Sequence, residues 1–143
     1  MAKIKIRKVV QSLDLDDYYG SGESEIIRVW VNPPRAIREQ HNENVTNARE
    51  VVEQMSKVDP DDAEAVEKLA ERLQSTAALI NGFWSTLWSQ DRDESTHWSP
   101  EEVAQLQKDC NDHDPGLWQF ITTMSIGMMN DYISGNQKKG KRR

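Results

Sequence analysis

The sequence is poor in cysteine and has no long apolar run. Cys110 is its single cysteine in 143 residues, so an intrachain disulfide is excluded and a reducing compartment fits best. No hydrophobic stretch reaches the roughly 20 residues needed to span a membrane, and the mean hydropathy is -0.80. Residues 3–6 alternate lysine with isoleucine, where a signal peptide would carry a continuous hydrophobic segment. These absences predict a soluble cytoplasmic protein that does not engage a membrane.

Sequence motifs for common enzyme chemistry are also missing. The chain contains no G-x-S-x-G, no Walker phosphate-binding loop, no G-x-G-x-x-G and no H-E-x-x-H. Each of these motifs supplies the nucleophile, the phosphate cradle or the metal ligands of a large enzyme class. We therefore expect a protein that is not an enzyme, with no catalytic residues and no cofactor.

Two weak clusters could suggest a metal ion. His97, Cys110 and His113 offer three ligands, whereas a structural zinc site needs four in a recognised spacing. The acidic residues within 14–17 resemble the start of a calcium loop, but residues 18 and 19 are tyrosines where an EF-hand needs a ligand and a turn glycine. A half-buried thiol, loop histidines and a solvated acidic turn are the simpler interpretation, so we expect no metal site.

Basic residues are scarce in the middle of the chain. The formal net charge is -6, yet four cations lie within residues 3–8 and five within residues 138–143. The remaining nine basic residues are set against all 24 acidic residues, which lie between Gln11 and Gly135. Such an acidic body repels phosphate groups, so nucleic acid is not an expected partner.

Two short strands are expected near the N-terminus. Residues 3–10 alternate and end in two valines, and residues 26–31 place Ile27, Val29 and Val31 on one face. Residues 14–23 between them are rich in glycine, serine and acids, which favours a loop. The pattern predicts a small β-hairpin over about residues 3–31.

Four helices are expected after the hairpin, because four segments combine a capping residue with proline. These start signals are Asn32-Pro33-Pro34, Asp59-Pro60-Asp61-Asp62, Ser99-Pro100-Glu101-Glu102 and Asp114-Pro115. The sequence thus predicts a mainly α fold, a four-helix domain with a small N-terminal β-hairpin. A single domain is expected over residues 1–135, followed by a disordered basic tail over residues 136–143.

Apolar stripes predict which side of each helix is buried. Apolar or aromatic residues recur at steps of three and four after every start signal. The stripe expected on the first helix consists of Ile37, His41, Val45, Ala48, Val52 and Met55. This stripe is thin and partly polar, whereas that of the second helix is the longest in the chain.

Tryptophan and methionine are plentiful in the second half of the chain. Most of the five tryptophans are expected in the core, and some can serve as interface anchors. The methionines of the last helix either fill the core or form an adaptable surface for a partner helix of variable sequence. The residues that we single out for partner binding are Trp84, Trp88, Trp118, Met124, Met128 and Met129.

The order of features along the chain resembles that of the tail assembly chaperones of long-tailed siphophages and related prophages. A basic strand, an acidic loop and then Ile27-Arg28-Val29-Trp30-Val31-Asn32-Pro33-Pro34 resemble the opening of these proteins. Their helical body, tryptophan-containing polar segment and short C-terminal helix pair resemble Trp84-Ser85-Thr86-Leu87-Trp88, Trp98-Ser99-Pro100-Glu101 and Asp114-Pro115-Gly116-Leu117-Trp118. The resemblance spans nearly the whole chain, with a longer charged helical stretch between Val45 and Leu73 as a departure.

The resemblance implies a chaperone that binds the long, helical tape-measure protein and keeps it soluble while tail-tube subunits are recruited. Such a protein acts in the host cytoplasm and is absent from the mature virion. A homo-oligomer is possible, because many copies are needed to cover a repetitive client.

Family members are often also made as a longer frameshifted form, whose extension recruits the tail-tube protein. Codon degeneracy allows slippery heptamers over Gln137 to Lys141, which motivates the same hypothesis here. The alternative is another phage structural, connector or tail-completion protein that remains in the virion. A helical DNA-binding regulator would need a basic recognition helix, and none of the four expected helices is basic.

Overall fold

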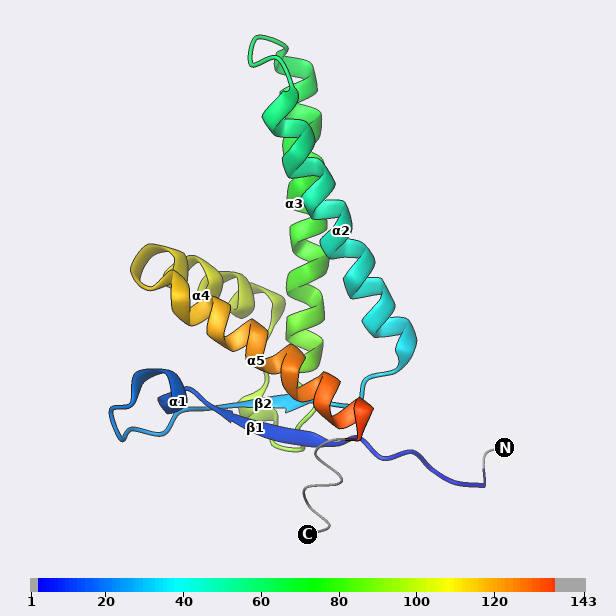
Figure 1. The fold of residues 1–143 in the computed structure, drawn as a ribbon, viewed down its shortest axis with the longest axis vertical. Helices are drawn as coiled ribbons and strands as arrows, with labels where there is room; N and C mark the ends of the chain where they lie inside the picture. The colour runs from blue at the N-terminus through cyan, green and yellow to red at the C-terminus, as the bar shows by residue number, and fades with distance from the viewer. Residues whose placement is uncertain (1–2, 136–143) are drawn as a thin grey trace. The chain divides into compact units, whose positions relative to one another are not determined.

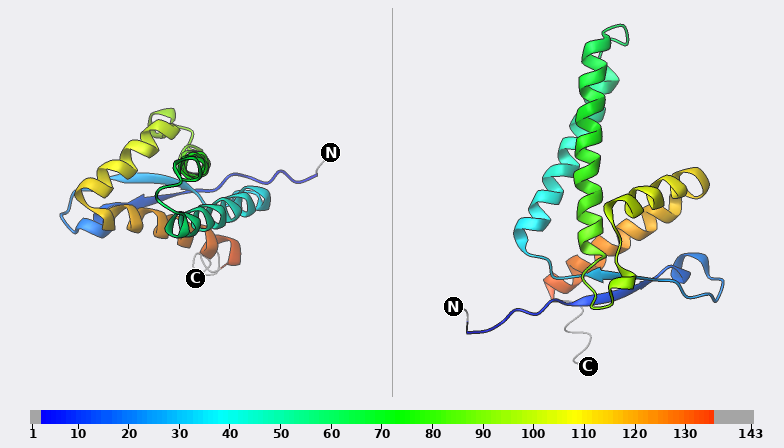
Figure 2. Two further views of the ribbon diagram at one scale, coloured as in Figure 1. Left: turned by 90° about the horizontal axis from the view of Figure 1, so that it is seen from above. Right: turned by 180° about the vertical axis from the view of Figure 1, so that it is seen from behind.

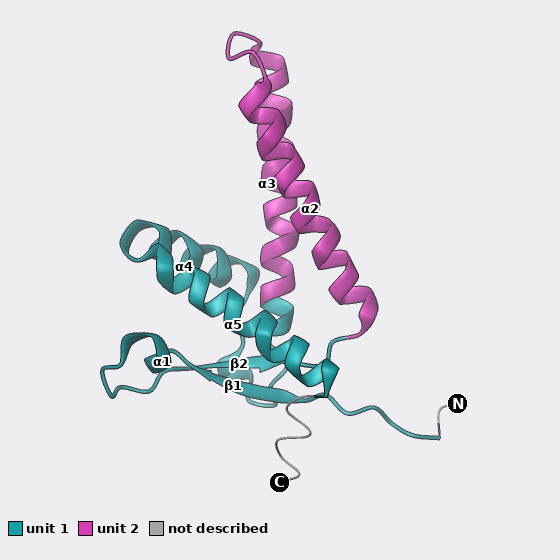
Figure 3. Ribbon diagram, viewed as in Figure 1, with its two compact units in different colours: residues 1–33, 85–143 teal, residues 34–84 magenta. Residues whose placement is uncertain are grey.

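The computed structural model describes residues 3–135 and confirms a mainly helical fold with a small antiparallel hairpin near the N-terminus (Figure 1). The chain divides into two compact units (Figure 3). Unit 1 combines Met1–Pro33 with Ser85–Arg143, and unit 2 is Pro34–Trp84. The expected single domain over residues 1–135 stays a prediction, and the expected disordered tail over residues 136–143 lies outside the described residues.

The hairpin of unit 1 pairs β1 (Val10–Asp14) with β2 (Ile26–Trp30). Leu13 faces Ile27 in this register, and both side chains are buried. The expected first strand over residues 3–10 is wrong, because β1 begins only at Val10, preceded by one backbone hydrogen bond from the Val31 amide to the Val9 carbonyl at 2.9 Å. Ile4 and Ile6 remain 77% and 81% exposed. Alternation alone does not make a strand where no partner strand runs alongside.

Asn32 closes the open end of the hairpin. Its Oδ1 accepts a hydrogen bond from the Val9 amide at 2.8 Å, and its Nδ2 donates to the Arg7 carbonyl at 2.7 Å. The expectation that Asn32 caps the next helix is therefore wrong. Pro34 occupies the N-cap position of that helix instead.

The loop of the hairpin contains a one-turn helix, α1 (Asp16–Tyr19), that the sequence did not predict. The Asp16 carboxylate accepts hydrogen bonds from Ser21 and Gly22, and the Asp14 carboxylate accepts from Ser24. These bonds lower the pKa of both carboxyl groups, with the serine hydroxyl as the largest cause in each case. The acidic side chains therefore organise the turn, and Gly20 and Gly22 supply its positive φ angles.

Two helices complete unit 1 after the short 3-10 turn η1 (Glu94–Thr96). The helix α4 (Pro100–His113) begins at the expected start signal with a capping box, in which Ser99 and Glu102 bond reciprocally. The helix α5 (Pro115–Ser134) follows immediately, packs antiparallel to α4 and also contacts β1 (Figures 1 and 2). Both helices begin where the sequence predicts, although the Asp114 side chain makes no capping hydrogen bond at the start of α5.

Unit 2 is a pair of long helices, α2 (Arg35–Lys57) and the greater part of α3 (Ala63–Leu87), whose last three residues belong to unit 1. The two helices run in opposite directions and diverge toward the start of α2 (Figures 1 and 2). α3 starts three residues later than its proline signal suggests, because Asp59 to Asp62 form a turn. The Asp62 carboxylate then accepts from the Ala65 amide at 3.2 Å.

The buried side of α2 is rotated relative to the predicted stripe. His41, Asn44 and Val51 are its buried residues, whereas Val52 is 54% exposed. Ile37, Ala48 and Met55 of the predicted stripe are half-buried on the same row as His41. Val45 and Val52 belong to the neighbouring row, where Val45 is half-buried and Val52 is exposed. In helices of mixed polarity, steps of three and four alone do not separate such rows.

Candidate protein-binding surface

Trp88 is the centre of the core of unit 1. The rings of Trp98 and Trp118 lie edge-to-face against it, with centroid distances of 6.0 and 6.1 Å. Its Nε1 donates a hydrogen bond to Ser125 Oγ at 3.2 Å, and both side chains are fully buried. Trp88 therefore fixes α5 to the segment that follows α3, and its side chain has no access to a partner.

Trp98 is held by its backbone. Its carbonyl accepts hydrogen bonds from Ser85 Oγ at 2.6 Å and Ser89 Oγ at 3.0 Å. Its amide donates to Ser89 Oγ at 2.8 Å. The polar segment after α3 thus has its backbone groups satisfied by serine side chains and needs no regular secondary structure.

Trp84 belongs to a separate aromatic cluster in unit 2. The His41 ring stacks on Phe83 with centroids 3.8 Å apart, and the Trp84 ring approaches His41 edge-on at 5.5 Å. Burial lowers the pKa of His41, and its Nδ1 has no hydrogen-bond partner among the described residues. A neutral imidazole costs less to bury in this apolar setting than a charged one. The cluster of His41, Phe83 and Trp84 therefore forms a packed core contact between α2 and α3.

The helix α5 presents two apolar rows to different surroundings. Its inward row, spaced every four residues, is fully buried or nearly so and consists of Leu117, Ile121, Ser125 and Met129. The next row around the helix is only partly covered and consists of Phe120, Met124, Met128 and Tyr132. Met124 is 39% exposed, and Met128 is half-buried. We call this second row the methionine row.

The N-terminal end of α5 is anchored by Tyr18 of α1. The Tyr18 hydroxyl donates to Asp114 Oδ1 at 2.8 Å, and its ring lies 5.3 Å from that of Phe120. The hydrogen bond to the carboxylate raises the pKa of Tyr18. A side chain at Gly116 would meet the Tyr18 oxygen at 2.9 Å, so glycine permits this approach. Sequence reasoning missed this contact because it joins residues 96 positions apart.

The structure keeps the weak metal candidates apart. His97 Nε2 bonds to the Asp91 carbonyl at 2.7 Å, Cys110 is buried and His113 is exposed. Across residues 3–135, no group of three or more histidine, cysteine or acidic side chains is placed to hold a metal ion. Burial raises the pKa of the Cys110 thiol, which disfavours the reactive thiolate.

The six residues singled out for partner binding therefore have different surroundings. Trp84, Trp88 and Met129 are buried. Met124 and Met128 lie together in the methionine row, and half-buried Trp118 packs on Trp88. The binding role of these residues stays a prediction, and the methionine row is the part of the set that a partner can reach without opening the core.

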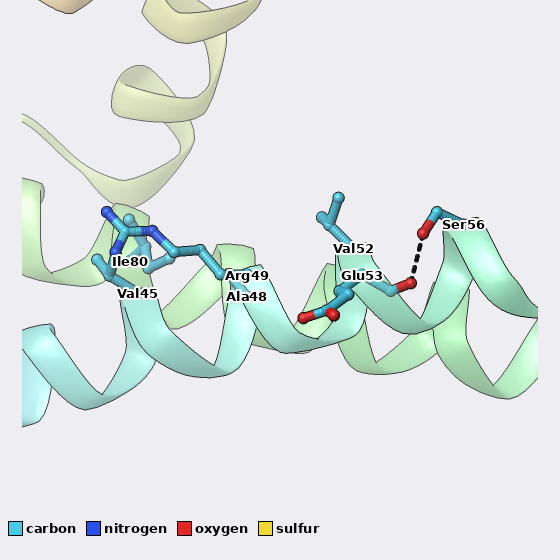
Figure 4. A pocket seen from close by; sticks show the side chains of 7 residues that line it. All are labelled: Val45, Ala48, Arg49, Val52, Glu53, Ser56 and Ile80. Carbon is cyan, nitrogen blue, oxygen red and sulfur yellow. Dashed lines mark hydrogen bonds between the residues drawn. The ribbon is translucent and has the colours of Figure 1, made fainter.

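A second apolar surface lies in unit 2 and was not singled out from the sequence. It is a groove of about 430 Å³ lined by six residues of α2 and by Ile80 of α3 (Figure 4). Its apolar floor comes from Val45, Ala48, Val52 and Ile80. We call it the α2 groove. The sequence carries no separate signal for it, because Val45 and Val52 fall in the apolar stripe that was expected to face inward.

Comparison of the chain with protein-family models, curated proteins and solved structures finds no match. None of the helices within residues 3–135 has the length and apolar content to cross a bilayer.

Proposed function

We propose that the chain is a non-catalytic phage tail assembly chaperone that binds the tape-measure protein. The observation that carries this proposal is the methionine row, an apolar strip on α5 left partly open beside a fully packed inward row. Methionine is flexible and polarisable, so it adapts to helical clients whose apolar faces vary in sequence. A long tape-measure protein presents many such faces.

The charge distribution supports this role. Acidic residues dominate the chain between Gln11 and Gly135, which keeps a complex soluble while its apolar strip is occupied. Partner helices commonly dock by laying an apolar face against an exposed apolar surface of the protein that binds them. The proposed setting is the host cytoplasm, with the tail-tube protein recruited through a longer frameshifted form.

The experiment is co-expression with a tape-measure protein encoded in the same genome as this chain. Met124→Asp combined with Met128→Asp should abolish co-purification of the client, because two carboxylates would be buried without partners. Thr123→Asp is the matched control, since Thr123 is an exposed α5 residue outside the row. Met124→Asp alone guards against misfolding, because Met124 is the more exposed of the two methionines. Unchanged client recovery with both methionine variants would refute the proposal.

The second candidate is a structural or connector protein of the virion. Only the resemblance to phage tail proteins favours this candidate, because a connector would show the same surface features as a chaperone. Mass spectrometry of purified virions separates the two, because a chaperone is absent from mature particles and a connector is present. The frameshift hypothesis rests on residues 136–143, outside the described residues, and is tested by reading the nucleotides that encode them.

A further inference from the structure

The helix pair of unit 2 leaves much of its apolar surface open. None of the residues of α3 from Ala63 to Gly82 is buried. Val52 on α2 is 54% exposed and Leu79 on α3 is 58% exposed. Helices gain most of their stability from tertiary packing of an apolar face, and two helices alone cover little of it. The exposed apolar residues of this helix pair are therefore open to packing by a further helix.

The lining of the α2 groove is symmetric along the helix. Its six α2 residues fall in pairs about a point between Glu50 and Val51, namely Val45 with Ser56, Ala48 with Glu53 and Arg49 with Val52. A twofold axis that runs between two copies at the level of that point, perpendicular to both helices, places α2 antiparallel against the α2 of an identical chain. Twofold contacts of this kind require a surface that is complementary to itself.

The charged residues of the groove meet that requirement. Arg49 and Glu53 both line the groove and are four residues, about one turn, apart on α2. The Arg49 side chain extends toward Val45 and Ile80 (Figure 4). In the antiparallel arrangement, Arg49 lies about one residue, or roughly 1.5 Å of helical rise, from the level of Glu53 in the second copy. Two reciprocal ion pairs then flank the apolar floor, and the opposite signs fix the register.

Neither charge is strongly engaged within its own chain. Arg49 makes no ion pair within the described part of the chain, and Glu53 pairs with Lys57 at 3.0 Å on the same exposed helix face. Exposed pairs one turn apart contribute little, so Glu53 can exchange this partner at low cost.

We propose that the chain forms a twofold homodimer in which α2 grooves meet face to face, with Arg49 of each copy paired to Glu53 of the other. Val52 of each copy packs into the groove of its partner, and the two helix pairs form a four-helix arrangement. The dimer does not depend on the identity of any client, so it can fail while the chaperone proposal stands.

The test is sedimentation equilibrium of the full chain and its charge variants. The wild type should approach twice its 16.5 kDa mass as concentration rises. Arg49→Glu and Glu53→Arg should each weaken the dimer at least about tenfold, since each makes both interchain pairs repulsive. An equimolar mixture of the two variants should recover dimer, because a heterodimer of one copy of each again places opposite charges at both interchain contacts. If Arg49 instead paired with Glu53 of its own chain, mixing the two variants would not restore the dimer.

Glu43→Arg is the matched control, since it makes the same charge change on the opposite side of α2 and should leave the dimer intact. Circular dichroism confirms that each variant keeps its helices. A wild type that stays monomeric at roughly 1 mM overturns the proposal. So does a dimer that both charge variants leave unchanged, or variants whose mixture stays monomeric.

Discussion

The two units of this chain differ in how completely they bury their apolar residues. In unit 1, the sheet, α4 and α5 each contribute fully buried side chains, among them Val29, Val103 and Ile121. In unit 2, α2 buries three residues and α3 buries none from Ala63 to Gly82. The difference motivates the two proposals made above. Unit 1 has a closed core next to the partly exposed methionine row, whereas the helix pair of unit 2 leaves many of its own apolar residues exposed.

The largest expected effect is on the core of unit 1. Trp88→Ala removes the ring that joins Trp98 to Trp118 and leaves Ser125 Oγ without its donor. We expect a loss of about 3–5 kcal/mol in the free energy of unfolding. Urea unfolding followed by circular dichroism measures it, with Thr123→Ala on the exposed side of α5 as the reference. A loss as small as that of Thr123→Ala would contradict the central role of Trp88 in the core of unit 1.

Two adjacent valines sharpen the comparison within unit 2. Val51 is fully buried and Val52 is 54% exposed. Val51→Ala should cost about 2 kcal/mol, from the methyl groups withdrawn from the core. Val52→Ala should cost less than about 0.5 kcal/mol when measured on monomer in dilute solution. Equal losses at both positions would contradict the division of α2 into a buried row and an open row.

A smaller effect is expected at the start of α4. Ser99 Oγ accepts a hydrogen bond from the Glu102 amide at 3.1 Å, and the Glu102 carboxylate accepts one from the Ser99 amide at 3.0 Å. Ser99→Ala should lower the free energy of unfolding by about 1 kcal/mol, and Ser99→Asp should retain most of it. Thermal unfolding of the three proteins gives the order. Because α4 packs against α5, Ser99→Ala also tests whether the methionine row of α5 depends on α4.

The smallest effect is a pH dependence that arises from His41 in unit 2. Burial lowers the pKa of His41 below 6.5, so the unfolded chain binds a proton that the folded chain resists. Stability should therefore be full above pH 6.5 and fall as the pH drops through that value toward the folded pKa. Urea midpoints at pH 7.5 and 5.5 measure the fall, which His41→Gln should reduce. An identical fall in the variant would place the acid sensitivity elsewhere.

Much of the fold could be predicted from the sequence because its helix starts are explicit. Ser99-Pro100 and Asp114-Pro115 define α4 and α5 locally, and the structure confirms both. The first strand could not be placed, since Lys3 to Val10 alternates as well as a true strand does. Only the register with β2 decides where pairing begins. Asn32 likewise looked like a helix cap until its contacts with Arg7 and Val9 were visible.

The candidate site was predictable only in part. Composition pointed to Met124 and Met128, but spacing could not separate them from Met129 on the buried row next to them. The α2 groove was hidden for a similar reason, because Val45 and Val52 share a helical period with residues that face inward. Which row of a helix is buried depends on the angle of the helix against its neighbour, and that angle is a tertiary property.

The most direct test of the proposed function measures the soluble fraction of the tape-measure protein with and without this chain in the same cells. The account predicts that the client is insoluble alone and moves into the supernatant, bound to the chain, on co-expression. A tape-measure protein that stays insoluble beside abundant folded chain, or that is equally soluble without it, would contradict the account.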